Sequence, residues 1–137
     1  MQAIDRIINK ESGLLGISRI SNDHRDIEHG IENNDEMCIL AEKMYIRRIV
    51  DYIAKYYVLL GGVDAIAFTA GVGENSYQVR KRVIDSLKVL GIKLDEEANK
   101  VMGREALITT SDSSIPCYVI PTDEELMIAR DTYNLVK

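Results

Sequence analysis

A glycine-containing segment that joins an apolar stretch to a helical pattern has the clearest potential for ligand chemistry. Its members are Gly71, Val72, Gly73, Glu74 and Asn75. Glycine tolerates positive φ angles and lets a ligand approach the backbone without a Cβ in the way. The helix that follows offers free N–H groups and the positive end of its dipole. These residue types in this order predict a turn that binds a phosphate or a nucleotide.

The turn matches neither of two common glycine motifs for nucleotides. No Gly-Lys-Ser/Thr sequence follows it, so it is not a P-loop, and the third glycine of the dinucleotide fingerprint is missing. Many strand–helix turns contain glycine for backbone geometry alone. Taken from these residues only, the structural explanation therefore stays open beside the ligand-binding one.

Two further places combine polar groups in a useful way. Asp23 and Arg25 lie two residues apart on a polar segment, where a carboxylate and a guanidinium could surround one ligand. The alternative is a helix cap with a surface ion pair. Glu124 follows a predicted buried strand, at the edge of the sheet where a carboxylate can hold Mg²⁺ directly or through water. The alternative is an acidic residue stabilised by the helix dipole.

Other polar residues favour structural roles. We expect His24 and His29 on the surface, because neither has a partner at metal-ligand spacing. The basic run at residues 80–82 is typical of a solvated helix face. The tyrosines at 45, 52, 56 and 57 fall on the longest helical pattern and are expected in the core and in subunit contacts.

The elements that must position these groups are predicted from periodicity and from turn residues. Helices are expected over residues 1–9, from a cap at Asn22 or Asp23 to Gly30, and over residues 34–60, with an apolar loop at 12–18. A strand at 65–69, apolar on both faces, suits a sheet covered on both sides.

The second half of the chain alternates between the two kinds of element. Beyond the turn, the pattern predicts helices at 77–90, 95–100 and 123–135, and strands at 106–109 and 117–120. Thr122 and Glu125 match a capping box for the last helix. This order predicts an α/β fold with about three strands and flanking helices, in a single domain over residues 1–137.

Composition excludes several classes. The 137 residues are enough for one domain, and 46% of them are hydrophobic, which is enough for a core. The net charge of −5 disfavours nucleic acid as a partner. No apolar run reaches the length of a membrane span, and no signal peptide opens the chain. Cys38 and Cys117 match no metal spacing and are expected to be reduced thiols in a cytoplasmic protein.

Three segments together resemble the acetate kinase family, in the order that the family has them. The first is residues 12–18 with Asp23-x-Arg25-Asp26, the second is residues 64–76 with Val79-Arg80, and the third is residues 119–126 with residues 128–130. The resemblance covers essentially all of this chain but only the C-terminal third or so of the family's chain. Propionate kinase shares these motifs, so they do not distinguish the two substrates.

The resemblance implies a ribonuclease-H-like half of the actin–hexokinase–Hsp70 type of fold, in partial form. It also implies phosphoryl transfer between ATP and a short carboxylic acid, with ATP/ADP and Mg²⁺ as cofactors. Carried over residue by residue, Asp23, His24 and Arg25 match the adenosine-side segment. Residues 71–75 match the adenosine and phosphate loop, and Glu124 matches the magnesium-associated glutamate.

The chain departs from the family pattern in what it lacks. The residues that bind the acyl phosphate in the family lie upstream of Met1, so we expect the chain alone to be inactive and to meet a short-chain carboxylate only with the missing domain. The family's C-terminal domain forms the dimer interface, which implies a homodimer. The alternatives are a piece of a propionate kinase, or a non-catalytic domain that binds nucleotide or self-associates.

Overall fold

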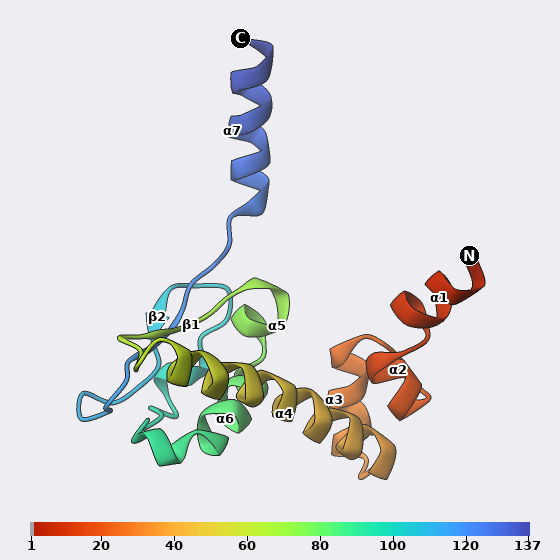
Figure 1. The fold of residues 1–137 in the computed structure, drawn as a ribbon, viewed down its shortest axis with the longest axis horizontal. Helices are drawn as coiled ribbons and strands as arrows, with labels where there is room; N and C mark the ends of the chain where they lie inside the picture. Colours follow the sequence, from red (N-terminus) through yellow and green to blue (C-terminus); the bar gives the residue numbers. More distant parts are fainter. Residues whose placement is uncertain (1) are drawn as a thin grey trace. The chain divides into compact units, whose positions relative to one another are not determined.

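The computed structural model describes residues 2–137, and its internal contacts divide them into two compact units. Unit 1 ends at Gly62 and unit 2 begins at Val63. The expectation of a single domain over residues 1–137 stays a prediction, and each unit is described by itself. Figure 1 labels the helices and strands of both.

Unit 1 is built from helices around α4. Its described residues form α1 (Gln2–Lys10), α2 (Gly13–Ser18), α3 (His24–Glu32) and α4 (Glu36–Leu59). Helices α2 and α3 both pack against α4. Ile27 of α3 and the first half of α4 supply the core, where Cys38 and Ala41 are fully buried. The predicted helix at 1–9 corresponds to α1, except that Met1 lies outside the described residues.

Capping residues set the ends of the unit 1 helices. Asp23 caps α3 by accepting a hydrogen bond from the Arg25 N–H, as one of the two predicted caps. Asp35 caps α4 in the same way, so this helix begins two residues after its predicted start at residue 34. It ends at Leu59, before Gly61 and Gly62, whose φ angles of 72° and 123° cannot continue a helix.

The predicted loop at residues 12–18 is wrong, because residues 13–18 form α2. This helix of six residues starts at Gly13, which has a φ of 64°, and its C-cap is Arg19 in the left-handed region. Helix α2 packs against α4, so its apolar side chains are half-buried and Ser18 is buried. The half-buried residues are Leu14, Leu15 and Ile17. Tertiary packing therefore overrides the low helix propensity of the two glycines.

Unit 2 is an α/β unit around a three-stranded mixed sheet, as predicted. The strands β1 (Ile66–Phe68), β2 (Ala106–Leu107) and β3 (Cys117–Val119) have the order β1-β3-β2. Strand β1 pairs with β3 in parallel, and β2 pairs with β3 antiparallel. The helices are α5 (Ala70–Asn75), α6 (Tyr77–Ser86) and α7 (Glu124–Val136), with 3₁₀ turns η1 (Lys88–Leu90) and η2 (Ala98–Lys100).

The core of unit 2 lies between the sheet and α6. Its buried apolar side chains are Phe68, Val79, Val83, Ile84, Leu87, Ile92, Ile108, Ile115, Cys117 and Val119. The sheet is not covered on both faces at β1, contrary to the expectation, because Ala67 is exposed. The helix predicted over 77–90 is interrupted, since α6 ends at Ser86 and η1 completes the span before Gly91.

No helix among residues 2–137 combines the length and the apolar character needed to cross a membrane.

Candidate functional site

The glycine-containing segment after β1 is a short helix rather than a turn. Residues 70–75 form α5, and the left-handed φ of 57° belongs to Ala70 and not to Gly71 or Gly73. The glycines serve other purposes. A Cβ at Gly73 would lie 3.2 Å from the backbone carbon of Phe68, so this glycine lets α5 pack closely on the strand. A Cβ at Gly71 would meet nothing within 4 Å, so this glycine faces open space.

An open pocket of about 360 Å³ lies between α5 and the start of α7. It is lined by Ala70, Gly71, Glu74, Thr122, Asp123, Glu124 and Glu125. The pocket therefore joins two of the predicted site segments, which are far apart in the sequence. They meet because parallel strands β1 and β3 end at the same edge of the sheet, so that the segments following them become neighbours.

Glu74 links the two sides of this pocket directly. Its Oε1 accepts hydrogen bonds from the backbone N–H of Thr122 at 2.8 Å and from the Thr122 hydroxyl at 3.0 Å. These bonds, the backbone bond first, lower the pKa of the Glu74 carboxyl. The predicted capping box at Thr122 is consequently wrong. Asp123 caps α7 instead, by accepting a hydrogen bond from the Leu126 N–H at 3.2 Å.

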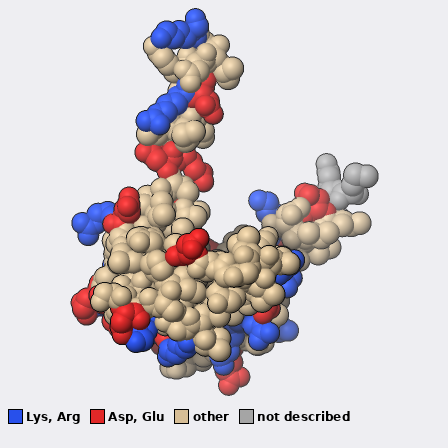
Figure 2. Space-filling view, turned by 60° about the vertical axis from the view of Figure 1, so that its left-hand side comes forward, with Lys and Arg blue, Asp and Glu red and all other residues tan. Residues whose placement is uncertain are grey.

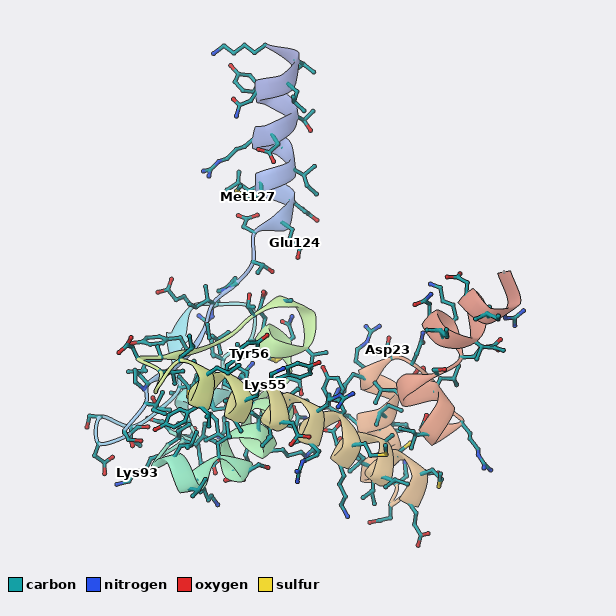
Figure 3. The ribbon with its side chains drawn as sticks, viewed as in Figure 1. Asp23, Lys55, Tyr56, Lys93, Glu124 and Met127 are labelled. Atoms are coloured by element: carbon teal, nitrogen blue, oxygen red, sulfur yellow. The ribbon has the colours of Figure 1, made fainter. Side chains whose placement is uncertain are left out.

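Glu124 is the first residue of α7, and Figure 3 shows it at the base of that helix. It is exposed, as are the other side chains of α7. Four of the residues that line the pocket are acidic and none is basic, and acidic side chains gather at the base of α7 in Figure 2. A phosphate would be repelled there unless a cation accompanied it.

The described residues contain no group of three or more metal-ligating side chains arranged around one point. Glu124 thus offers a single carboxylate, with Asp123 and Glu125 as neighbours on the pocket wall. Mg²⁺ in proteins is commonly held by one or two carboxylates together with substrate phosphates and water. The donor set at this pocket fits that mode and does not fit an all-protein cage.

Arg80 is the residue of this region that sequence reasoning missed. It was expected on a solvated face, but it is fully buried. Its guanidinium donates to the carbonyl oxygens of Gly73 at 2.9 Å and Glu74 at 3.0 Å. The remaining donors reach Asn99 Oδ1 at 2.9 Å, and the Asn99 and Val101 carbonyls at 2.6 Å each. A run of three basic residues contains no signal that one of them points inward.

Arg80 therefore fixes the carboxyl end of α5 from the core side. Burial lowers the pKa of its guanidinium, but every donor group has an acceptor. The neighbouring Lys81 behaves as predicted, because it is partly exposed and pairs with Asp85 and Glu96.

Asp23 and Arg25 form an ion pair at the start of α3. Asp23 accepts from the backbone N–H of Arg25 at 2.9 Å and from its Nε at 3.0 Å. The Arg25 side-chain hydrogen bond is the main reason that the pKa of Asp23 is lowered to about 2. The Arg25 side chain remains 89% exposed, so its guanidinium plane is accessible to a ligand.

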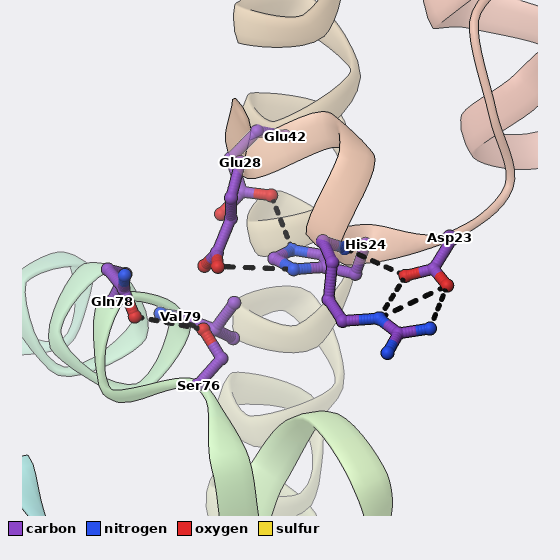
Figure 4. Close-up of polar contacts among 8 residues, drawn as sticks. Asp23, His24, Glu28, Glu42, Ser76, Gln78 and Val79 are labelled. Atoms are coloured by element: carbon purple, nitrogen blue, oxygen red, sulfur yellow. Dashed lines mark hydrogen bonds and ion pairs between the residues drawn. The ribbon is translucent and has the colours of Figure 1, made fainter. Parts of the chain in front are cut away.

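His24 is buried, which contradicts its expected surface position. Its ring is only 8% exposed, and its Nε2 lies 2.7 Å from Oε2 of Glu42 on α4 (Figure 4). The Nδ1 atom lies 3.7 Å from Glu28, and the ring centroid is 5.4 Å from that of Tyr45. As the first residue of α3, His24 faces the helix against which α3 packs. His29 is exposed, as expected.

Asp23, His24 and Arg25 belong to unit 1, whereas the pocket belongs to unit 2. Their participation in one common site therefore stays a prediction.

Solved structures that resemble this chain include acetate kinases and a propionate kinase. The crystal structure of Porphyromonas gingivalis acetate kinase matches with a TM-score of 0.87 and 43% identity, over 99% of this chain and 34% of that one. A propionate kinase from Francisella tularensis matches with a TM-score of 0.83 and 36% identity, over 94% of this chain and 33% of that one.

The amino-acid sequence identifies the family. Residues 1–130 match the model of the Acetokinase family, to which this chain belongs. The acetate kinase of Chlorante-Aster yellows phytoplasma is 58% identical over 128 residues, which are 93% of this chain and 31% of that protein. The acetate kinase of Clostridium novyi is 54% identical over 134 residues, which are 98% of this chain and 33% of that protein. The chain spans about a third of the length of these relatives. The predicted family and α/β fold class are confirmed.

Proposed function

We propose that this chain contributes the nucleotide and magnesium side of the cleft in an ATP:acetate phosphotransferase, which converts acetate and ATP to acetyl phosphate and ADP. The observation that carries the proposal is the pocket between α5 and α7. It places the Gly71 segment and Glu124 side by side, and these are the segments that resemble the family's phosphate loop and its magnesium-associated glutamate.

The backbone of residues 71–75 contacts the nucleotide in this proposal. Gly71 is suited to close approach, because the position where a Cβ would lie is open and the residue lines the pocket. The Asn75 side chain donates to the Gly71 carbonyl at 2.9 Å, which orders the segment internally. On this proposal, the other residues of the segment contact the nucleotide mainly through main-chain atoms; they are Val72, Gly73, Glu74 and Asn75.

Glu124 positions Mg²⁺ or its coordinated waters against the phosphates. Mg²⁺ held there would neutralise charge on the transferring phosphoryl group, which is the principal requirement of such reactions. The acidic lining favours binding of the nucleotide as its magnesium complex, since the only charged side chains among the described residues that line the pocket are carboxylates, which repel a free polyphosphate.

The Asp23–Arg25 pair serves the adenosine. The exposed guanidinium of Arg25 packs beside the base or ribose, and Asp23 holds it in place. His24 acts indirectly in this proposal. Its buried ring binds Glu42 and so fixes the start of α3, where Asp23 and Arg25 lie.

The carboxylate substrate, on this proposal, is bound by the domain that the relatives have and this chain does not span. The 137 residues alone are therefore inactive, and act as part of a cytoplasmic homodimer. Propionate is the alternative substrate, which the likeness to the Francisella tularensis propionate kinase favours.

A non-catalytic, self-associating domain is the second candidate. It is favoured by the exposed tyrosines of α4, where Tyr52 and Tyr56 are 50% and 53% exposed and stack with centroids 6.4 Å apart. Sedimentation of the chain, with Tyr52→Ser and Tyr56→Ser variants, measures this association.

Calorimetry with ADP tests the first proposal. Wild-type chain is titrated with ADP in Mg²⁺ and with ADP in EDTA, and Mg²⁺ is expected to strengthen binding. Glu124→Gln should remove most of this gain, whereas Glu105→Gln, which removes an exposed charge outside the pocket, should keep it. Absence of ADP binding, or equal binding with and without Mg²⁺, contradicts the proposal. A coupled assay with acetate and MgATP should show no ADP release.

A further inference from the structure

We propose that the side chains of Glu74 and Thr122 form a positioning bridge, which holds Glu124 at the correct place beside the α5 backbone. The inference rests on the proposed function and deepens it. It gives the Glu74 carboxylate a role that is separate from the main-chain contacts of residues 71–75. It also makes Thr122, which no sequence pattern marked as a site residue, a determinant of magnesium-dependent binding.

The first argument is the geometry of the bridge. One oxygen of Glu74, Oε1, accepts both the backbone N–H and the hydroxyl of Thr122, at 2.8 Å and 3.0 Å. Hydrogen bonds to an ionised carboxylate are stronger than those between neutral groups. Two such bonds from one residue restrict both the position and the rotation of the Thr122 backbone.

The second argument is the place of Thr122 in the chain. The strand ladder continues to Ile120, whose N–H donates to the Phe68 carbonyl at 2.9 Å. Pro121 has no N–H with which to extend it. The next donor, Thr122, is taken by Glu74, and the Thr122 carbonyl then accepts the N–H of Glu124 at 3.0 Å. Hydrogen bonds therefore run from the Glu74 carboxylate to the backbone of Glu124.

The third argument is that Glu74 is itself held firmly. Buried Arg80 donates to the Glu74 carbonyl at 3.0 Å and to the preceding carbonyl, that of Gly73, at 2.9 Å. The main chain of Glu74 is thus fixed to the core, while its side chain reaches the connector to α7. The side chains of α7 are exposed, so packing of that helix does little to position Glu124.

The test measures how strongly Mg²⁺ improves ADP binding to the 137-residue chain, by calorimetry in Mg²⁺ and in EDTA. Glu74→Ala is expected to reduce the gain from Mg²⁺ by about tenfold or more, the value of a lost charge-assisted hydrogen bond. Binding in EDTA should not weaken, because the main chain of residues 71–75 stays in place through Arg80 and one carboxylate that repels free ADP is removed. A purely structural role would weaken both.

Substitutions at Thr122 provide the matched comparison. Thr122→Val keeps the shape and the N–H but removes the hydroxyl, and should lose part of the gain. Thr122→Ser retains the hydroxyl and should keep most of it. The double variant Glu74→Ala with Glu124→Gln should be no worse than Glu124→Gln alone, because both changes act on one element. If Glu74→Ala fails to fold by circular dichroism, Glu74→Met is the substitute, because it keeps the length of the side chain and removes the acceptor oxygen.

The outcomes separate the two proposals. If Glu124→Gln abolishes the gain from Mg²⁺ and Glu74→Ala leaves it intact, the bridge has no positioning role and the inference is overturned, while the proposed function stands. If the unsubstituted chain does not bind ADP, the proposed function is wrong, and the inference, which rests on it, is wrong as well. Hydrogen exchange adds a ligand-free readout, since the Thr122 amide should exchange faster in Glu74→Ala, and unchanged exchange would contradict the bridge.

Discussion

Arg80 and Asn99 are joined in the core of unit 2 by two hydrogen bonds, from Arg80 Nε to Asn99 Oδ1 at 2.9 Å and from Nη2 to the Asn99 carbonyl at 2.6 Å. The Asn99 side chain in turn donates to the Tyr77 carbonyl at 2.9 Å. The start of α6, the η2 turn and the end of α5 are therefore held together by one buried cation. Because Glu74 lines the pocket and its carbonyl accepts from Arg80, this arrangement fixes one wall of the pocket.

Replacing Arg80 should destabilise the protein strongly. Arg80→Met keeps the apolar stem but leaves the Gly73, Glu74, Asn99 and Val101 carbonyls without their donor, at a cost of about 3 kcal/mol or more. Arg80→Lys should not restore stability, because a single ammonium cannot replace the planar fork. Urea unfolding measures the loss. Arg104→Met, at an exposed position, is the control and should change stability by less than about 0.5 kcal/mol.

Ala70 is expected to be a site of backbone strain. Its φ of 57° lies in the left-handed region, which costs a residue with a Cβ roughly 1 kcal/mol. Ala70→Gly should therefore stabilise the protein by up to about 1 kcal/mol, less the entropy that glycine adds to the unfolded chain. Thermal unfolding should show a higher midpoint. A lower midpoint would mean that the Ala70 methyl group contributes packing that outweighs the strain.

The two glycines of α5 should respond differently to the same substitution. Gly73→Ala places a Cβ 3.2 Å from the Phe68 backbone and should lower the unfolding midpoint. Gly71→Ala meets nothing within 4 Å and should leave stability equal or raise it by about 0.5 kcal/mol. Gly71→Ala should nevertheless weaken MgADP binding, because its Cβ lies on the pocket wall. Unchanged affinity in Gly71→Ala would argue against close approach of the nucleotide there.

Asp23 should contribute to stability in a defined pH range. Its folded-state pKa of about 2 lies below the ordinary value of 3.8, so the stabilisation is present above pH 4 and is lost as pH falls toward 2. Asp23→Asn retains a capping side chain but removes the charge. Urea midpoints at pH 7, 4 and 2 should differ between wild type and variant at the two higher values and converge at the lowest. A constant difference would mean that the Arg25 ion pair has no part in it.

Local patterns were sufficient for the elements that depend on neighbours in sequence. The apolar spacing of residues 34–60 predicts α4 because a long amphipathic stripe favours helix whatever it packs against. Asp23 was recognisable as a cap, and alternating element types indicated the three-stranded α/β arrangement. The motifs around Gly71 and Glu124 were also identifiable, since their residue types mark a strand end followed by a helix.

Only the tertiary structure decided which polar groups face inward and which segments meet. Three polar side chains illustrate this, because each occurs in a polar stretch and bonds to a partner that is 18 or more residues away. The pairs are Arg80 with Asn99, His24 with Glu42, and Thr122 with Glu74. Burial of Arg80 and His24 is tolerated because distant segments supply their hydrogen bonds. The spacing of residues within one segment does not predict which distant segment will do so. The pocket itself exists because two parallel strands end at one edge, which is a property of the assembled sheet.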